Sequence, residues 1–335
     1  MKKNIIKKII ASVLSLSLLF ALTACGTAGS ESSTTSDSYK VAIVKQMDHP
    51  SLDEIANAVA AELDGFVADG AKITYEIYSG QGDQSVLMQI GNQAIADGVD
   101  VIVPIATLAA QVMTVCAEES KTPVVFAAVS DPAAAELTGI DYVTGVSDAL
   151  NTAFIMDMML AQNPNVKNVG LLYSLSEINS ATPIADAKAY LDAKGIAYTE
   201  VTSNTNDEVI AAANTLIAQG VDAVFTPTDN IIMAAELAIY ESLIDAGIPH
   251  YTGADSFVRS GAFATCGVNY TDLGGQSGRL AYQAVTEGME AMKDFYLAEG
   301  GIITVNTETA AALNLDYNAA FGSMGPIVEV ATTAE

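Results

Sequence analysis

The chain has 335 residues, of which 50% are hydrophobic and 16% charged, and its 40 acidic and 14 basic side chains give a net charge of -26. This length predicts about two domains, and the apolar fraction excludes a chain that is disordered throughout. The shortage of lysine and arginine argues against direct binding of nucleic acid, because affinity for polyphosphates comes from cations that neutralise them.

Residues 1–24 predict a secretion signal that is removed. They carry four lysines and no acid, and then the apolar run 9–24, which is the order of a signal peptide and is short for a membrane-spanning helix. The run ends in Leu22-Thr23-Ala24-Cys25-Gly26, which resembles a bacterial lipobox. That resemblance implies cleavage before Cys25 and attachment of a lipid such as palmitate to it. An ordinary signal peptide that ends near a cysteine is the alternative.

Residues 25–38 are predicted to form a flexible tether, because this stretch of Gly, Ser, Thr and acids has no large apolar side chain after Cys25. A lipid anchor with such a tether would hold a folded body at the extracytoplasmic face of the cell membrane. Cys116 and Cys266 lie in apolar patterns and are expected to be buried thiols rather than a disulfide or metal ligands. With only two histidines, the chain offers no His-rich zinc site, and we expect no metal and no cofactor.

From Lys40 onward, short β-branched runs alternate with amphipathic patterns, which predicts an α/β fold with doubly wound parallel sheets covered on both faces. The expected strands are 40–46, 72–78, 100–105, 123–128, 168–173, 197–202, 222–226, 249–253 and 262–268, and the expected helices are 53–66, 85–96, 107–119, 206–218, 230–246 and 273–288.

The two series of strands look like copies, since Ala-Asp-Gly-Val-Asp at 96–100 matches Ala-Gln-Gly-Val-Asp at 218–222. We therefore expect two similar lobes joined by hinge crossovers. Lobe 1 would comprise 40–146 plus about 270–300, and lobe 2 would comprise 147–268 plus about 302–325. The first crossover is expected at 144–147, the Gly-rich stretch 274–278 is interpreted as another, and 302–335 as a last strand with a polar tail.

A ligand is expected beyond the carboxyl ends of the strands, where helix N-termini present free N–H groups. Neutral polar groups there suit a small carboxylate and a nearby aspartate suits an ammonium, which together indicate a zwitterion such as an amino acid. The candidate ligand-binding residues are Gln46, Met47, His49, Thr107, Ser130, Asp131, Asn179, Ser180, Thr228, Asp229 and Asp255.

Structural roles compete with binding at most of these positions. Ser130 and Asp229 can act as helix N-caps, His49 before a proline can be a turn residue, and Asp255 can form an Asx turn. Met47 can belong to the core. Walker loops, nucleophile elbows and metal-binding spacings are missing from the sequence, so we expect a protein that is not an enzyme.

The organisation of lipobox, tether and two α/β lobes resembles the type I substrate-binding lipoproteins of ABC importers. Four stretches are similar to the tryptophan/tyrosine-binding branch of that family: Gln46 with His49-Pro50-Ser51-Leu52-Asp53, Val129-Ser130-Asp131-Pro132, Ser176-Glu177-Ile178-Asn179-Ser180 and 258–265. The resemblance runs over about 40–295. Ser51, where relatives often have alanine, and Lys45 depart from the pattern and weaken any inference about which amino acid binds.

This resemblance implies a monomeric extracytoplasmic receptor that closes on an amino acid and passes it to a membrane permease driven by an ATPase subunit. By analogy, Thr107 and Ser130 would contact the ligand carboxylate, Asp229 and Asn179 the ammonium, and Gln46 and Met47 the side chain. The alternatives are a receptor for a branched amino acid, peptide, nucleoside or sugar, and a sensing module without transport. The absence of tryptophan argues mildly against a sugar.

Overall fold

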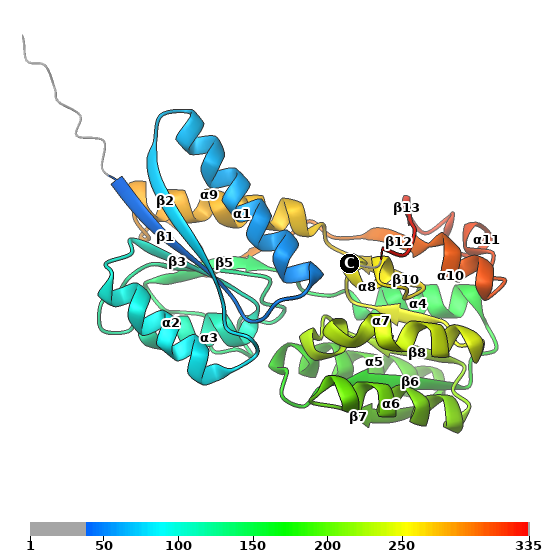
Figure 1. Cartoon of the computed structure of the whole chain (residues 1–335). Coiled ribbons are helices and arrows are strands. Elements are labelled where there is room, and N and C mark those ends of the chain that lie inside the picture. Colours follow the sequence, from blue (N-terminus) through cyan, green and yellow to red (C-terminus); the bar gives the residue numbers. More distant parts are fainter. Residues whose placement is uncertain (1–37, 334–335) are drawn as a thin grey trace, which may run out of the picture. The chain divides into compact units, whose positions relative to one another are not determined.

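The computed structural model describes residues 38–333, which build two sheets with helices on both faces (Figure 1). The predicted signal peptide, the lipidation site Cys25 and nearly all of the tether lie outside the described residues. Within the described range, no helix is both long and apolar enough to cross a membrane. The α/β class with two doubly wound sheets is confirmed.

Sheet A defines lobe 1 and has the strand order β11-β5-β4-β3-β1-β2, with every pairing parallel. Its strands are β1 (Ser38–Lys45), β2 (Lys72–Ser79), β3 (Val101–Ile105), β4 (Val124–Ala127), β5 (Val143–Ser147) and β11 (Tyr296–Leu297). Its helices are α1 (Pro50–Ala68), α2 (Gln84–Ala96), α3 (Thr107–Cys116) and α9 (Tyr270–Thr286). Helices α1 and α9 pack together on one face, and α2 and α3 on the other (Figure 1).

Sheet B defines lobe 2 and has the order β13-β12-β10-β9-β8-β6-β7, in which only the β10–β12 pair is antiparallel. Its strands are β6 (Asn168–Tyr173), β7 (Ala197–Thr202), β8 (Ala223–Thr226), β9 (His250–Thr252), β10 (Ala264–Gly267), β12 (Ile302–Asn306) and β13 (Ile327–Val330). Its helices are α4 (Thr152–Gln162), the 3-10 turn η1 (Ile178–Ser180), α5 (Ala181–Lys194), α6 (Asn206–Gln219), α7 (Asn230–Asp245), α8 (Asp255–Arg259), α10 (Thr307–Ala312) and α11 (Tyr317–Phe321).

The internal duplication is visible in the sheets. The order β2-β1-β3-β4-β5 in lobe 1 corresponds to β7-β6-β8-β9-β10 in lobe 2. Helices cover both faces of the sheet, so a strand such as β3 is buried at every position. This is why the sequence shows continuous apolar runs there. Each lobe therefore brings the carboxyl ends of β1, β3 and β4, or of β6, β8 and β9, to one edge.

Three local expectations were wrong. Residues 144–147 belong to strand β5, which pairs with β4, so the chain leaves sheet A only after Ser147. The Gly-rich stretch 274–278 lies inside helix α9, where a Cβ at Gly274 would come within 2.6 Å of the Ile55 carbonyl oxygen of α1, so glycine permits close helix packing. The segment from 302 is not one strand and a tail but β12, α10, α11 and β13.

The apolar core continues from one lobe to the other. One cluster of buried side chains includes Leu52 and Ile55 of α1, Met233 of α7, Phe257 of α8 and Tyr270 of α9. Cys116 and Cys266 are free thiols. Cys266 is buried in the core of lobe 2, as expected for a small apolar residue, whereas Cys116, also expected to be buried, is only half-buried at the edge of the core of lobe 1.

Candidate functional site

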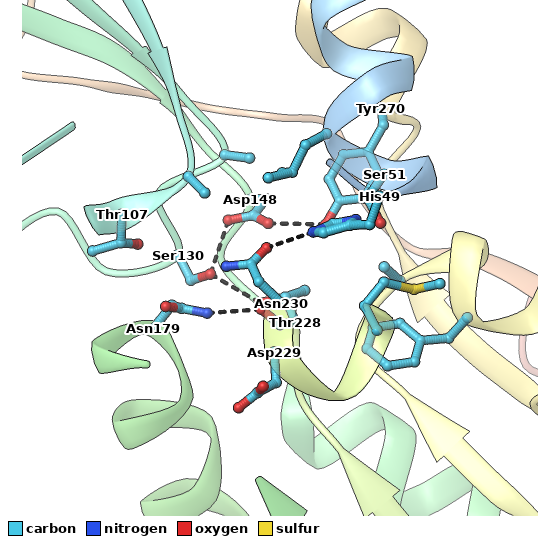
Figure 2. Close-up of a pocket in the computed structure, with 16 residues that line it drawn as sticks. His49, Ser51, Thr107, Ser130, Asp148, Asn179, Thr228, Asp229, Asn230 and Tyr270 are labelled. Atoms are coloured by element: carbon cyan, nitrogen blue, oxygen red, sulfur yellow. Dashed lines mark hydrogen bonds between the residues drawn. The ribbon is translucent and has the colours of Figure 1, made fainter. Parts of the chain in front are cut away.

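A small cavity lies where the carboxyl ends of strands from both sheets meet (Figure 2). The cavity has a volume of only about 20 Å³, so the lobes close tightly around it. The polar side chains that line it are His49, Ser51, Thr107, Ser130, Asp148, Asn179, Thr228, Asp229, Asn230 and Tyr270, and the apolar ones are Leu52, Ala106, Ala128, Met233, Ala254 and Phe257.

Six of the residues predicted from the sequence line this cavity: His49, Thr107, Ser130, Asn179, Thr228 and Asp229. The hydroxyl groups of Ser130 and Thr228 are 3.0 Å apart and join the two lobes, and Asn179 donates from Nδ2 to the Thr228 carbonyl oxygen at 2.7 Å. The structure therefore brings together loops as far apart in sequence as those that carry His49 and Asp229.

The other five predicted residues do not line the cavity. Gln46 is buried behind it and Met47 lines a wider groove outside it. Asp131 accepts a hydrogen bond from the backbone N–H of Ala134 and from Thr182 Oγ1 across the lobes. Ser180 donates to Asp229, and Asp255 pairs with Arg259 on the same short helix. Their predicted ligand contacts stay predictions.

Asp229 is fully engaged as the N-cap of helix α7. Its Oδ1 accepts the N–H groups of Ile231 and Ile232 at 3.1 Å each, and its Oδ2 accepts the Ser174 N–H and the Ser180 hydroxyl at 2.7 Å each. Burial raises the pKa of this carboxyl, although these hydrogen bonds oppose the rise. Four accepted hydrogen bonds use up the lone pairs of a carboxylate, so the structural role is well supported.

Asp148 is the carboxylate in the wall that has free accepting capacity. It is 4% exposed and accepts the Ser130 hydroxyl at Oδ1 (2.9 Å) and the Tyr270 hydroxyl at Oδ2 (3.1 Å) (Figure 2). Burial raises the pKa of Asp148 above its ordinary value. Across residues 38–333, no lysine, arginine or histidine forms an ion pair with it. A buried carboxylate of this kind is complementary to a cation in the cavity.

The N-terminus of helix α3 faces the same cavity, and although Gln46 Oε1 accepts the Leu108 N–H there, the cap residue Ala106 supplies no side-chain acceptor. Ala106, at the cap position, has φ = 76°, and Ala128 after β4 has φ = 56°, so both cavity-lining alanines adopt left-handed backbone. The hydroxyl of Thr107, the first helical residue, is buried and has no hydrogen-bond partner in the described structure. Free N–H groups and an unpaired hydroxyl at a helix N-terminus form a binding site for an anion.

A continuous hydrogen-bond network joins the lobes behind the cavity. The Leu108 N–H donates to Gln46 Oε1 (3.2 Å), and Gln46 Nε2 donates to Glu177 Oε1 (2.7 Å). Asn230 Nδ2 donates to Glu177 Oε2 (2.6 Å), and Asn230 Oδ1 faces His49 Nε2 (3.0 Å). Burial, together with the nearby Asp229, raises the pKa of Glu177 to about 7, and burial lowers the pKa of His49 to about 4.

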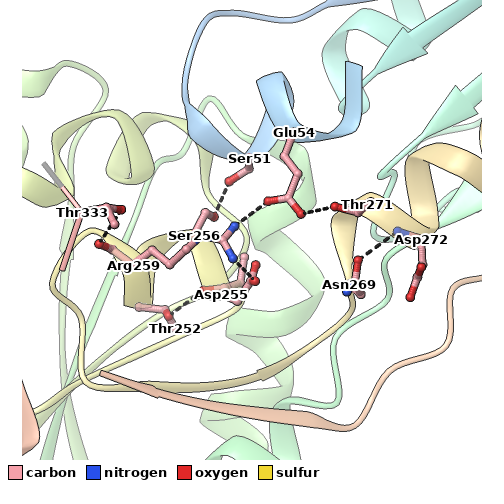
Figure 3. A network of polar contacts seen from close by, with 11 residues as sticks. Ser51, Glu54, Thr252, Asp255, Ser256, Arg259, Asn269, Thr271, Asp272 and Thr333 are labelled. Atoms are coloured by element: carbon pink, nitrogen blue, oxygen red, sulfur yellow. Dashed lines mark hydrogen bonds and ion pairs between the residues drawn. The ribbon is translucent and has the colours of Figure 1, made fainter. Parts of the chain in front are cut away.

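A second set of cross-lobe contacts lies at α1 and α8 (Figure 3). The Ser51 and Ser256 hydroxyls are hydrogen-bonded, and Arg259 pairs with Glu54, which also accepts the Thr271 hydroxyl at 2.8 Å. These contacts border a groove of about 710 Å³ that is open to solvent and shares His49 and Met233 with the inner cavity. No cluster of potential metal ligands occurs in residues 38–333.

Sequence reasoning missed Asp148, Tyr270 and the roles of Glu177 and Asn230. Asp148 directly follows strand β5. Because ligands are expected beyond the carboxyl ends of the strands, Asp148 would have been a candidate if 143–147 had been predicted as a strand. Tyr270 starts a helix after a crossover and has no comparable signal. Glu177 was in a noted motif, but its burial depends on Gln46 of the other lobe.

Comparisons with known proteins agree with this geometry. A family model described as ABC transporter substrate binding protein matches residues 40–322. A tyrosine-binding protein of Clostridioides difficile strain R20291 is 30% identical over 329 residues, which is 93% of each chain.

Two solved structures are similar over most of this chain. An ABC domain from Streptococcus pneumonia in complex with L-Trp has a TM-score of 0.80 at 27% identity and covers 87% of this chain and 100% of its own. The ligand-free, open structure of a substrate-binding protein with adhesive properties from Clostridium difficile has a TM-score of 0.64 at 26% identity, covering 88% and 100%. At nearly equal identity, this structure is thus more similar overall to the ligand-bound structure than to the ligand-free, open one.

Proposed function

The chain belongs to the ABC transporter substrate-binding proteins, and from that premise we propose that it captures an aromatic amino acid between its lobes for import. The family consists of solute-binding proteins rather than enzymes. The observation that carries the choice of an amino acid is the buried carboxylate of Asp148, which faces the cavity between the lobes and has no cation paired with it in the described residues.

In this proposal the ligand ammonium binds Asp148. Each oxygen of this carboxylate accepts one hydroxyl, from Ser130 or from Tyr270, and the carboxylate retains capacity for a further donor. An ammonium group would satisfy both the free lone pairs and the buried charge. We favour Asp148 over Asp229 because the latter already accepts four hydrogen bonds.

The ligand carboxylate would bind at the N-terminus of helix α3. The Thr107 hydroxyl supplies an unpaired donor there, and the first N–H groups of the helix add a favourable dipole. Ser130, the other residue expected on this side, instead donates to Asp148 in the structure. The two ends of an α-amino acid would thus be held by neighbouring loops of lobe 1.

The side chain would pack among apolar residues from both lobes. Leu52 comes from α1, Met233 from α7 and Phe257 from α8, and all three line the cavity. An aromatic ring gains most from such surroundings, because burial of apolar area contributes roughly 25 cal/mol per Å². The binding partners named for two similar proteins, tyrosine and L-Trp, support this choice.

Binding would proceed by closure of the hinge. The cavity is too small in this arrangement for an amino acid to enter, so the lobes must separate to admit one and close around it. The cross-lobe contacts, Gln46 with Glu177 and Ser130 with Thr228, would form on closure.

We place the protein at the extracytoplasmic face of the membrane, anchored through lipidated Cys25 after removal of the signal peptide. This rests on the basic start, the apolar run and the lipobox-like sequence of the first 25 residues. Its partners would be a membrane permease and the ATPase that drives it, and it would act as a monomer.

A thermal-shift screen of the mature body with the twenty amino acids tests the function. A ligand bound only by the native state raises the melting temperature, and a concentration 100-fold above Kd adds about 2.7 kcal/mol of stability. We expect tyrosine or tryptophan to give the largest shift, with a calorimetric stoichiometry of one. A protein stabilised only by a sugar or nucleoside, or by none of the amino acids, would refute the proposal.

A further inference from the structure

His49 presents a ring nitrogen without a partner in the wall of the cavity. The residue is 6% exposed, and within the described structure its Nδ1 has no hydrogen-bond partner although its Nε2 has one. His49 precedes helix α1 as its N-cap residue, but its side chain caps no backbone N–H there. A buried polar atom left unpaired is costly, so an unpaired ring nitrogen on a residue that lines a cavity indicates a group supplied by the ligand.

The hydrogen-bond network behind the cavity determines where the proton of this imidazole resides. A backbone N–H can only donate, so Leu108 fixes the Gln46 amide with its oxygen toward helix α3 and its Nε2 toward Glu177. Above its pKa of about 7 the Glu177 carboxylate is ionised and can only accept, so it also requires a donor, Nδ2, from Asn230.

The Asn230 amide is thereby oriented with its oxygen toward His49. An amide oxygen only accepts, so Nε2 of His49 must carry the proton in the 3.0 Å contact. Burial lowers the pKa of His49 to about 4, so the ring is neutral and carries this one proton. Nδ1 is consequently a bare acceptor.

We infer that His49 is a specificity-determining residue of the ligand site, whose Nδ1 accepts a hydrogen bond from an O–H or N–H donor on the ligand's aromatic side chain. The site thus prefers a phenol or an indole to an unsubstituted phenyl ring. This inference rests on the proposed function and adds the ligand chemistry that the site selects.

The donor belongs to the side chain rather than to the ammonium because of the layout of the cavity. Figure 2 shows Thr107 and His49 on opposite sides of Asp148. A ligand with its carboxylate at Thr107 and its ammonium at Asp148 therefore directs its side chain toward His49. Leu52, in the first turn of the helix that follows His49, supplies apolar contact on that side.

The test measures calorimetric affinity for two ligand pairs that differ in the side-chain donor: tyrosine against phenylalanine, and tryptophan against 1-methyltryptophan. For the wild type we expect the member with the donor to bind at least roughly tenfold more tightly, the scale set by an unpaired buried acceptor. His49→Leu should abolish this discrimination. His49→Gln, whose amide offers both a donor and an acceptor, should retain much of it. If His49→Leu weakens all four ligands equally, the inference is wrong.

A spectroscopic measurement on the wild type does not depend on how the variants fold. The chain has only two histidines, so histidine-selective ¹⁵N labelling gives a simple spectrum. At pH 8, where Glu177 is ionised, His49 should be protonated at Nε2 only, and its Nδ1 signal should differ between the tyrosine and phenylalanine complexes. His250 is the internal control, because both its ring nitrogens are paired, with Glu236 and Thr226.

The outcomes separate this inference from the proposed function. Equal affinity within both ligand pairs, or a protonated Nδ1 of His49 in the complex, overturns the inference and leaves the amino-acid receptor standing. Failure of all aromatic amino acids to bind overturns the proposed function and this inference with it.

Discussion

Asp148→Asn should remove ligand binding without harming the ligand-free protein. The substitution keeps the shape of a side chain that is 4% exposed and removes a charge that has no cationic partner among residues 38–333. The Ser130 and Tyr270 hydroxyls can rotate to suit an amide, so their two hydrogen bonds are partly retained. Loss of the buried pair with an ammonium costs about 2–5 kcal/mol, roughly 30-fold to several-thousand-fold in Kd.

Calorimetry and melting curves check this expectation together. The ligand-free variant should melt at the wild-type temperature or above it, because an uncompensated buried charge has been removed. An analogue of the ligand without its amino group should bind wild type and variant alike, which assigns the loss to the ammonium. Asp229→Asn is the matched control and should lower the melting temperature, because its amide nitrogen cannot accept the buried Ser174 N–H that Oδ2 accepts in the wild type. Wild-type affinity in Asp148→Asn would refute the reasoning.

Three further expectations follow from packing, titration and the predicted anchor. Burial in this closed arrangement raises the pKa of Glu177 from its ordinary 4.5 to about 7 and lowers that of His49 from its ordinary 6.5 to about 4, so we expect closure from a solvated open form to take up a proton at Glu177 and release one at His49. When the pH is lowered from 7 to 5.5, the calorimetric affinity of Glu177→Gln, which keeps only His49, should therefore fall by up to about tenfold. The affinity of His49→Gln, which keeps only Glu177, should rise by about as much, and that of the wild type should change less. Parallel pH profiles for the three proteins would contradict the coupling. Gly274→Val should destabilise the protein by about 1–3 kcal/mol in urea unfolding because α9 packs against α1 there, while Gly65→Ala, with nothing within 4 Å of its added Cβ, should be neutral or stabilising. Cys25→Ser should move the protein from the membrane fraction to the medium on fractionation, and unchanged membrane attachment would exclude the anchor.

Much of the fold could be predicted because the apolar runs, the amphipathic patterns with their terminal glycines and the internal repeat all indicate the same α/β architecture. The run Val101–Ile105 is apolar throughout and is buried at every position in β3, between helices on both faces. Gly220 ends helix α6 in a left-handed conformation, the usual role of a glycine that follows an amphipathic pattern. The repeated pattern around 96–100 and 218–222 predicted two lobes, and the sheets share one strand order.

The site could be predicted only in part. A sequence pattern shows where strands end, but not which side chains and helix ends from other parts of the chain contact the residues there. The loops that carry Thr107, Ser130 and Thr228 were found, since each follows a recognisable strand. Whether a carboxylate such as Asp229 is used up by a helix N-terminus depends on geometry that one-dimensional spacing does not contain. The burial of Glu177 depends on a residue 131 positions away.

Asp148 follows the last residue of strand β5, and Tyr270 begins helix α9 just after the chain returns from sheet B. The acidic group proposed to hold the amino acid thus lies beside two of the crossovers between the lobes, where we expect a rotation of the lobes to displace atoms least. An amino acid can therefore bind lobe 1 through its charged groups while the lobes are apart. Lobe 2 then closes onto the aromatic ring. The protein would thus recognise the backbone common to all amino acids first, and would discriminate among their side chains as the lobes close.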